Sequence, residues 1–184
     1  MQPSYRGAIL GAAGLFAFGV AVAAIVAVSG AYNFAADAPH FDVTSDAIEY
    51  MRDRSVEVRS SGLMVPKLTD AKMIGNGASD YDEMCTSCHL APGLAENEMR
   101  PGLYPKPPIL YQAEADDPAE QFWIVKHGLK MSGMPAWGVT HSDTEIWNIV
   151  AFLQKLPALS PSQYRAIVAS AAGHHEQDHM GMAH

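Results

Sequence analysis

Two cysteines and a histidine form the pattern in this chain with the clearest chemical capability. Cys85 and Cys88 are separated by two residues, His89 follows directly, and the chain has no other cysteine. Two cysteines are too few for a disulfide framework or a four-cysteine zinc site. The spacing leaves a redox dithiol, half of a metal site, or a haem attachment point. A thioredoxin-like dithiol would sit near a βαβ pattern, which the sequence does not show.

The histidine directly after the second cysteine favours haem attachment. In this arrangement each thiol adds to one vinyl group of the haem, and the next residue lies under the iron on one face. We therefore expect one covalently attached haem c, held by Cys85 and Cys88, with His89 as an axial iron ligand.

A second axial ligand is expected from a methionine in the loop of residues 130–138. Met131 and Met134 both offer a thioether sulfur, which haem iron accepts opposite a histidine. Pro135 stiffens the backbone beside Met134, so we favour Met134 as the ligand and expect Met131 to line the haem pocket. Taken alone, either methionine is also suited to fill space in a core.

A proline-rich segment, residues 101–110, is expected to run as stiff, non-helical chain around the haem. A carbonyl of Pro107 or Pro108 is a candidate acceptor for a hydrogen bond from the second ring nitrogen of His89. Three side chains are candidate donors to the haem propionates: Arg100, Tyr104 and Trp137. For the two aromatic residues the alternative is simple packing with the polar tip outward.

Helices are expected to position these groups. Gly77, Tyr81 and Cys85 recur every four residues, which places them on one face of a helix beginning near Ala78 or Ser79. The absence of a side chain at Gly77 would permit a close approach by another helix.

Two further helices are expected to bracket the methionine loop. Asp117 and Pro118 mark the start of the first, and Gly128 is suited to end it. A capping box, Ser142 with Glu145, opens the second, over residues 143–156. Its apolar stripe is expected to cross the first helix near Gly77; the stripe is Ile146, Val150 and Leu153, with Trp147 beside it.

Composition and charge limit the classes of partner. Hydrophobic residues make up 48% and charged residues 17% of the 184 residues, which argues against global disorder. The formal net charge is −8, and because phosphate binding needs a basic face we expect no nucleic-acid partner. The acidic surface either steers a basic protein partner or only keeps the protein soluble.

Residues 7–30 carry no charged side chain and are predicted to be a transmembrane anchor. As a helix, residues 8–28 would span roughly 30 Å, one bilayer core. A cleaved secretory signal, the alternative, has a shorter apolar region. Arg6 precedes the segment and acidic residues follow it, so residues 1–6 are expected in the cytoplasm. We expect a single pass through a bacterial cytoplasmic membrane with the haem domain in the periplasm, because bacteria attach haem c outside that membrane.

The exported part is expected to have three sections. Residues 31–68 form a juxtamembrane connector with an amphipathic helix over residues 44–60, which Ser45 is suited to cap. That helix lies against the membrane or a partner, or it packs on its own domain. The haem domain is expected over residues 69–161 and a tail over residues 162–184. Residues 174–184 contain four histidines and two methionines, so the end of the tail either binds copper or is solvated and disordered.

Over residues 71–161 the chain resembles class I cytochromes c, in the subgroup similar to the cytochrome domains of haem–copper oxidases. The resemblance rests on Gly77-x-x-x-Tyr81-x-x-x-Cys85-x-x-Cys88-His89, on Met134-Pro135-Ala136-Trp137, and on Ile146-Trp147 with Phe152-Leu153. It implies an all-α cytochrome c fold around one haem, His/Met ligation and one-electron transfer without catalysis. The N-terminal anchor is similar to that of membrane-tethered monohaem cytochromes.

We therefore expect a membrane-tethered electron carrier between respiratory or other periplasmic redox partners. Two alternatives stay open. One is a haem or assembly subunit of a larger membrane oxidoreductase. The other is a haem peroxidase or gas sensor, which would need Met134 to be displaceable.

Overall fold

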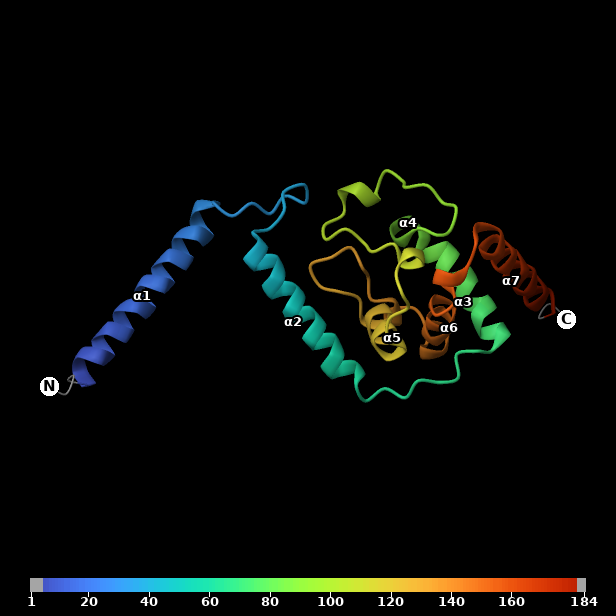
Figure 1. Ribbon diagram of the computed structural model, residues 1–184, viewed down its shortest axis with the longest axis horizontal. Helices are drawn as coiled ribbons and strands as arrows, with labels where there is room; N and C mark the ends of the chain where they lie inside the picture. The colour runs from blue at the N-terminus through green and yellow to red at the C-terminus, as the bar shows by residue number, and fades with distance from the viewer. Residues whose placement is uncertain (1–4, 182–184) are drawn as a thin grey trace. The chain divides into compact units, whose positions relative to one another are not determined.

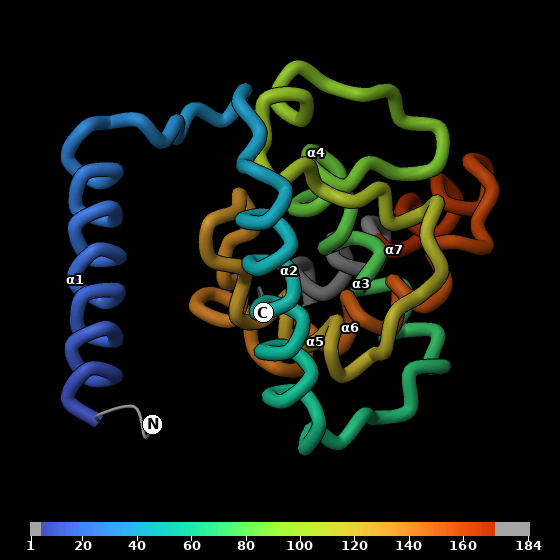
Figure 2. Tube along the Cα trace, turned by 60° about the vertical axis from the view of Figure 1, so that its left-hand side comes forward, coloured from blue at the N-terminus to red at the C-terminus, as the bar shows by residue number. Residues whose placement is uncertain are grey.

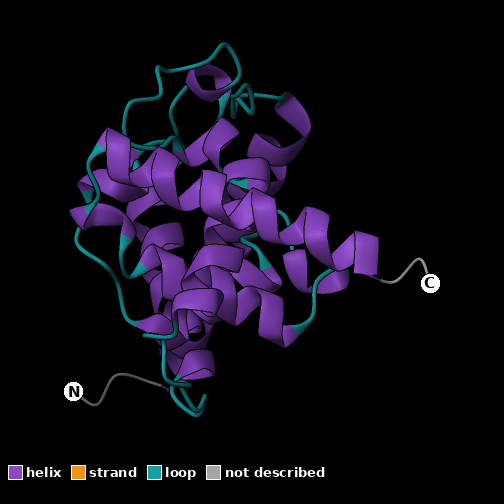
Figure 3. Cartoon of the chain, turned by 90° about the vertical axis from the view of Figure 1, so that its right-hand side faces the viewer, coloured by secondary structure: helices purple, strands orange, loops and turns teal. Residues whose placement is uncertain are grey.

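The computed structural model describes residues 5–181, with side chains described through Ala171. Seven α-helices and four short 3-10 turns make up its regular structure (Figure 1). Within the described residues there is no β-strand (Figure 3), which confirms the all-α class. The chain divides into two compact units, Met1–His40 and Phe41–His184, each described here by itself.

The first unit is dominated by one apolar helix. Helix α1, Tyr5–Ser29, is long and apolar enough to cross a membrane, and none of its side chains is buried within the chain. Its bounds lie close to those predicted for the anchor. A single helix of this kind near the N-terminus fits a single-pass membrane anchor.

Helix α2, Asp42–Ser60, opens the second unit and packs against α5, Pro118–His127 (Figure 2). The predicted cap at Ser45 is wrong, because Ser45 already lies inside the helix and its N–H bonds to the carbonyl of Phe41. Val56 and Ser60 are buried. These contacts support the interpretation of α2 as a packing helix of its own domain, and the unit boundary falls before α2 rather than within a connector extending to residue 68.

Helix α3, Ala71–Met84, begins earlier than predicted. The side chain of Asp70 accepts hydrogen bonds from the backbone N–H groups of Lys72 and Met73, at 3.0 Å each. This cap satisfies two of the unpaired donors of the first turn, so the helix starts at residue 71 and not near residue 78. The four-residue helix α4, Thr86–His89, follows directly.

Helix α6, Asp143–Leu153, crosses α3 at Gly77, as the sequence predicts. A Cβ atom on Gly77 would lie 1.9 Å from the carbonyl oxygen of Asn148, so only glycine permits this approach. The capping box at Ser142 and Glu145 is present. The helix ends sooner than expected, and a 3-10 turn, Leu156–Ala158, takes over its last residues.

Helix α7, Pro161–Gly181, extends the packing beyond the predicted domain boundary at residue 161. It lies against α3 (Figure 1), and the buried Tyr164 donates a hydrogen bond to the carboxylate of Asp82. The sequence carried a signal for this helix. Ser160 and Gln163 exchange the hydrogen bonds of a capping box, with Pro161 at the first helical position. The histidines and methionines of residues 174–184, for which copper binding is one of two expectations, lie outside the residues whose side chains are described.

Candidate functional site

The Cys-x-x-Cys-His sequence forms a tight turn at the junction of α3 and α4. The N–H groups of Cys88 and His89 both bond to the carbonyl of Cys85, which brings the three side chains into one helical turn. Neither cysteine forms a disulfide. The buried hydroxyl of Tyr81 donates to the carbonyl of Leu90 at 2.7 Å and so fixes the end of the turn.

Leu90 has a backbone conformation that favours glycine, with φ at +60° and ψ at −179°. Such a conformation costs on the order of 1–3 kcal/mol in a residue with a side chain. The bond from Tyr81 and the burial of the Leu90 side chain offset this strain. The strained residue directly follows His89, so the backbone of the turn has a fixed conformation at the residue that carries the imidazole.

Burial sets the protonation states of the thiol and the imidazole. It raises the pKa of the Cys85 thiol to about 12, so this thiol is protonated at neutral pH before any attachment. Burial also lowers the pKa of His89. The hydrogen bond that His89 donates to the Pro108 carbonyl opposes this effect, and the Arg100 charge adds to it. The imidazole is therefore neutral near pH 7, which is the form that binds a metal.

The second nitrogen of His89 has a defined partner. Nδ1 lies 2.9 Å from the carbonyl oxygen of Pro108, so of the two prolines proposed from the sequence the structure brings Pro108 to His89. Within the described residues, no protein group bonds to Nε2 of His89. A neutral imidazole that donates through Nδ1 presents Nε2 as a free lone pair, as an axial iron ligand requires.

Arg100, expected from the sequence as a donor to the propionates, has partners for its side chain within the protein. The residue is 4% exposed, and all three nitrogens of its guanidinium group have protein acceptors. These acceptors are the carbonyls of Cys88 and Pro107 and the carboxylate of Glu96. The structure thus gives the guanidinium other partners than those expected from the sequence.

Sequence reasoning missed two residues of this network. Asn97 donates to the carbonyl of Ser87 and accepts from the N–H groups of Met99 and Arg100 at 3.0 Å each. Glu96 pairs with Arg100 and with Lys106, and these two cations lower its pKa. The only signal in the sequence was the asparagine itself. An asparagine side chain commonly bonds to nearby backbone N–H groups, which predicts a local cap but no contact with the haem-binding turn.

The two methionines of the loop between α5 and α6 differ in how deeply they are buried. Met134 is half-buried and packs against the hydrophobic core, whereas Met131 is 73% exposed. The hydroxyl of Ser132 holds the loop closed. It donates to the carbonyl of Leu129 at 2.7 Å and accepts from the N–H of Met134 at 3.1 Å. Met134 therefore has a fixed backbone position.

Gly128 ends α5 as predicted and allows the methionine loop to fold back. It has a φ of +64°, and a Cβ atom here would lie 2.7 Å from the carbonyl oxygen of Met134. We expect Gly128→Ala to lower the free energy of unfolding by at least about 2 kcal/mol. Two costs add: the left-handed backbone conformation is unfavourable for alanine, and its Cβ atom clashes with the main chain of the loop. Urea denaturation measures this. Gly62→Ala, with open space around the position, is the control and should change stability little; equal effects of both changes would contradict the prediction.

Tyr104 and Trp137, the other residues proposed for the propionates, are both half-buried. Trp137 packs against the core and contacts the ring of His141 edge-on, with 5.5 Å between centroids. Leu103 comes within reach of the methionine loop, since a Cβ atom on Gly133 would lie 3.2 Å from its side chain. The proline-rich segment and the methionine loop are thus neighbours.

The donor set fits a covalently attached haem. Two thiols without a disulfide, a neutral imidazole with a free Nε2 and a thioether on a rigid loop are the groups such a cofactor needs. Within the described residues there is no cluster of three or more histidine, cysteine or carboxylate side chains that would suit a protein-bound metal ion instead.

Comparison with known proteins gave one match. Residues 72–153 match the family model described as cytochrome C oxidase, cbb3-type, subunit III. The matched region runs from the first turn of α3 to the end of α6 and contains the cysteine turn, the proline-rich segment and the methionine loop. No curated protein and no solved structure matched the chain.

Proposed function

We propose that this protein is a membrane-tethered one-electron carrier. The premise is that residues 72–153 form a class I c-type cytochrome domain with a covalently bound haem c, similar to the cytochrome domains of oxidases. The domain itself is a haem-based electron carrier. The tether and the nature of the partners are the parts that we add.

In this proposal Cys85 and Cys88 attach the haem through thioether bonds, and His89 and Met134 are the axial ligands. The observation that carries the assignment is the 2.9 Å contact between Nδ1 of His89 and the carbonyl of Pro108, which orients Nε2 as the ligand atom. The haem supplies a one-electron iron couple, and the chain holds it in a fixed environment. Tyr104 and Trp137 are proposed as donors to the propionates.

Ligation by two side chains favours electron transfer over catalysis. An iron with both axial positions filled by protein has no open site for a substrate, whereas a peroxidase or gas sensor needs one ligand to leave. Burial of Met134 against the core and the closed loop around Ser132 both oppose its departure.

Helix α1 is proposed as a retained anchor in a bacterial cytoplasmic membrane, with the haem domain in the periplasm. Its 25 residues exceed the length of a signal-peptide apolar region. The description of the matched family supports partners among membrane redox proteins, and it favours the second candidate function, a subunit of a larger oxidoreductase.

The test uses the full chain made in a bacterium that matures c-type cytochromes. We expect covalent haem in the membrane fraction and a reduced protein that does not bind carbon monoxide. Replacing both Cys85 and Cys88 with serine should abolish covalent haem. Exchanging α1 for a cleavable signal sequence is the matched control, and it should release the same haem protein in soluble form. Rapid carbon monoxide binding would contradict the ligand assignment, and haem protein that is soluble without the exchange would contradict the anchor.

A further inference from the structure

Arg100 is the one buried charged side chain among the described residues, and the proposed function gives it no task. A guanidinium that leaves water loses its hydration, and this loss is offset only where its N–H groups find acceptors with good geometry. The position of Arg100 in a loop, in the 3-10 turn Arg100–Gly102, gives no structural reason for a charge there. Its contacts supply the reason.

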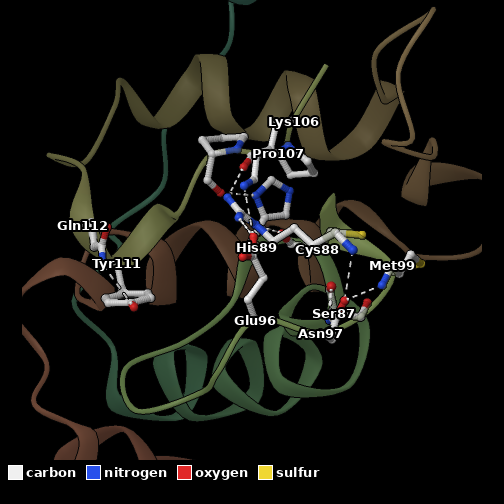
Figure 4. Close-up of polar contacts among 12 residues, drawn as sticks. Ser87, Cys88, His89, Glu96, Asn97, Met99, Lys106, Pro107, Tyr111 and Gln112 are labelled. Carbon is white, nitrogen blue, oxygen red and sulfur yellow. Dashed lines mark hydrogen bonds and ion pairs between the residues drawn. The ribbon is translucent and has the colours of Figure 1, made fainter. Parts of the chain in front are cut away.

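The guanidinium bridges the two backbone segments that carry the His89–Pro108 hydrogen bond. Nε donates to the carbonyl of Cys88 at 3.0 Å, and Nη2 donates to the carbonyl of Pro107 at 2.7 Å. Cys88 directly precedes His89, and Pro107 directly precedes Pro108. The arginine and the histidine therefore tie the same two segments together. Figure 4 shows Cys88, His89 and Pro107 close to one another, where these segments meet.

The arginine is itself held from the opposite side. Its Nη1 pairs with the carboxylate of Glu96, and Asn97 accepts from its backbone N–H while bonding to the carbonyl of Ser87. The rigid fork of an arginine reaches both backbone carbonyls and the carboxylate at once, which a lysine ammonium cannot do with the same geometry. The contacts thus require the shape of the guanidinium, and its charge alone does not explain them.

We infer that Arg100 is a positioning residue, which clamps the Pro107–Pro108 backbone onto the cysteine turn and so holds the hydrogen bond between Nδ1 of His89 and the Pro108 carbonyl. The inference rests on the proposed role of His89 as an axial ligand. A hydrogen bond from Nδ1 to a carbonyl makes the imidazole a more basic ligand, which favours the oxidised iron. Loosening the clamp therefore raises the reduction potential.

The experiment compares Arg100→Lys with Lys106→Gln in the haem-loaded full chain. Arg100→Lys keeps the charge but loses the fork, whereas Lys106→Gln removes a cation that pairs with the same Glu96 and touches neither carbonyl. We expect Nδ1–H of His89 to exchange with solvent about tenfold faster or more in Arg100→Lys, with a higher reduction potential. In Lys106→Gln the exchange rate should equal that of the wild type.

Two results would overturn the inference. One is an Arg100→Lys protein with wild-type exchange and potential. The other is an equal change of potential in both variants with unchanged exchange, which would assign only an electrostatic role to the arginine. A different result would refute the proposed ligation itself. If His89 were replaced and the low-spin absorption spectrum did not change, His89 would not be an iron ligand.

The wild-type protein provides a second measurement in case Arg100→Lys does not assemble. The inference requires Nε–H of Arg100 to exchange slowly and to show magnetic coupling across the hydrogen bond to the carbonyl carbon of Cys88. A rapidly exchanging, uncoupled Nε–H in the reduced wild-type protein would overturn it.

Discussion

Replacing Met134 with alanine is expected to abolish the sulfur-to-iron charge-transfer absorption of the oxidised protein and to lower the reduction potential by on the order of 0.1 V. A thioether favours the reduced iron more than water or a nitrogen ligand does, and axial ligands together span a range of about 0.8 V. Met134 is the methionine of its loop that packs against the core, and its N–H is held by Ser132. Optical spectroscopy with a redox titration measures both effects.

Met131→Ala is the matched control, because it removes the same thioether from the same loop. Met131 is 73% exposed, so its loss should leave the absorption and the potential as they are in the wild type. The assignment is wrong if the charge-transfer absorption persists in Met134→Ala or disappears in Met131→Ala. A Met134→His protein adds a third point, since a nitrogen ligand should restore a low-spin iron at a potential below that of the wild type.

The parts of the site that were predictable from the sequence are those that depend on spacing of a few residues. The cysteine turn, the cap at Gly128 and the capping box at Ser142 each require groups that lie within four positions of one another. Gly77 was predictable for a related reason, because its position on the face of Tyr81 marks where a neighbouring helix can approach. Local geometry decides all of these.

The contacts of Arg100 could not be predicted in the same way. Its two backbone acceptors, Cys88 and Pro107, lie 12 and 7 residues away along a segment with no helical or strand periodicity. In such a segment the backbone path is decided by tertiary contacts, and a sequence gives only the residue types. The residue type of Arg100 therefore indicated a group that needs acceptors, but it did not indicate these two carbonyls.

Two helix boundaries show how propensity misleads. Gly75 and Gly77 lower the helix propensity of residues 71–78, yet the cap at Asp70 and the packing on α6 keep that stretch helical. At the other end, the haem domain was expected to stop at residue 161 and a tail to follow over residues 162–184. Tyr164, whose hydroxyl bonds to Asp82, is buried against α3, and Ile167 and Val168 also pack against the core, so the start of α7 is docked.

Gly77→Ala is expected to lower the free energy of unfolding by at least about 3 kcal/mol, which for a domain of this size is a large fraction of the total. The new Cβ atom would lie 1.9 Å from the carbonyl oxygen of Asn148 and 2.8 Å from the backbone nitrogen of Ile149. Both are main-chain atoms of α6, so no change of rotamer relieves the clash and the two helices must separate. Since α3 ends in the cysteine turn, its displacement also moves Cys85 relative to the rest of the domain.

Gly75→Ala separates this packing effect from helix propensity. Gly75 lies in the same helix with open space around it, so an alanine there should raise stability by about 0.5–1 kcal/mol. Urea denaturation of the two haem-loaded variants should therefore show changes of opposite sign in the free energy of unfolding, although the same substitution is made only two residues apart. If Gly77→Ala proved as stable as the wild type, the close crossing of α3 and α6 would be wrong, and with it the framework that holds the cysteine turn.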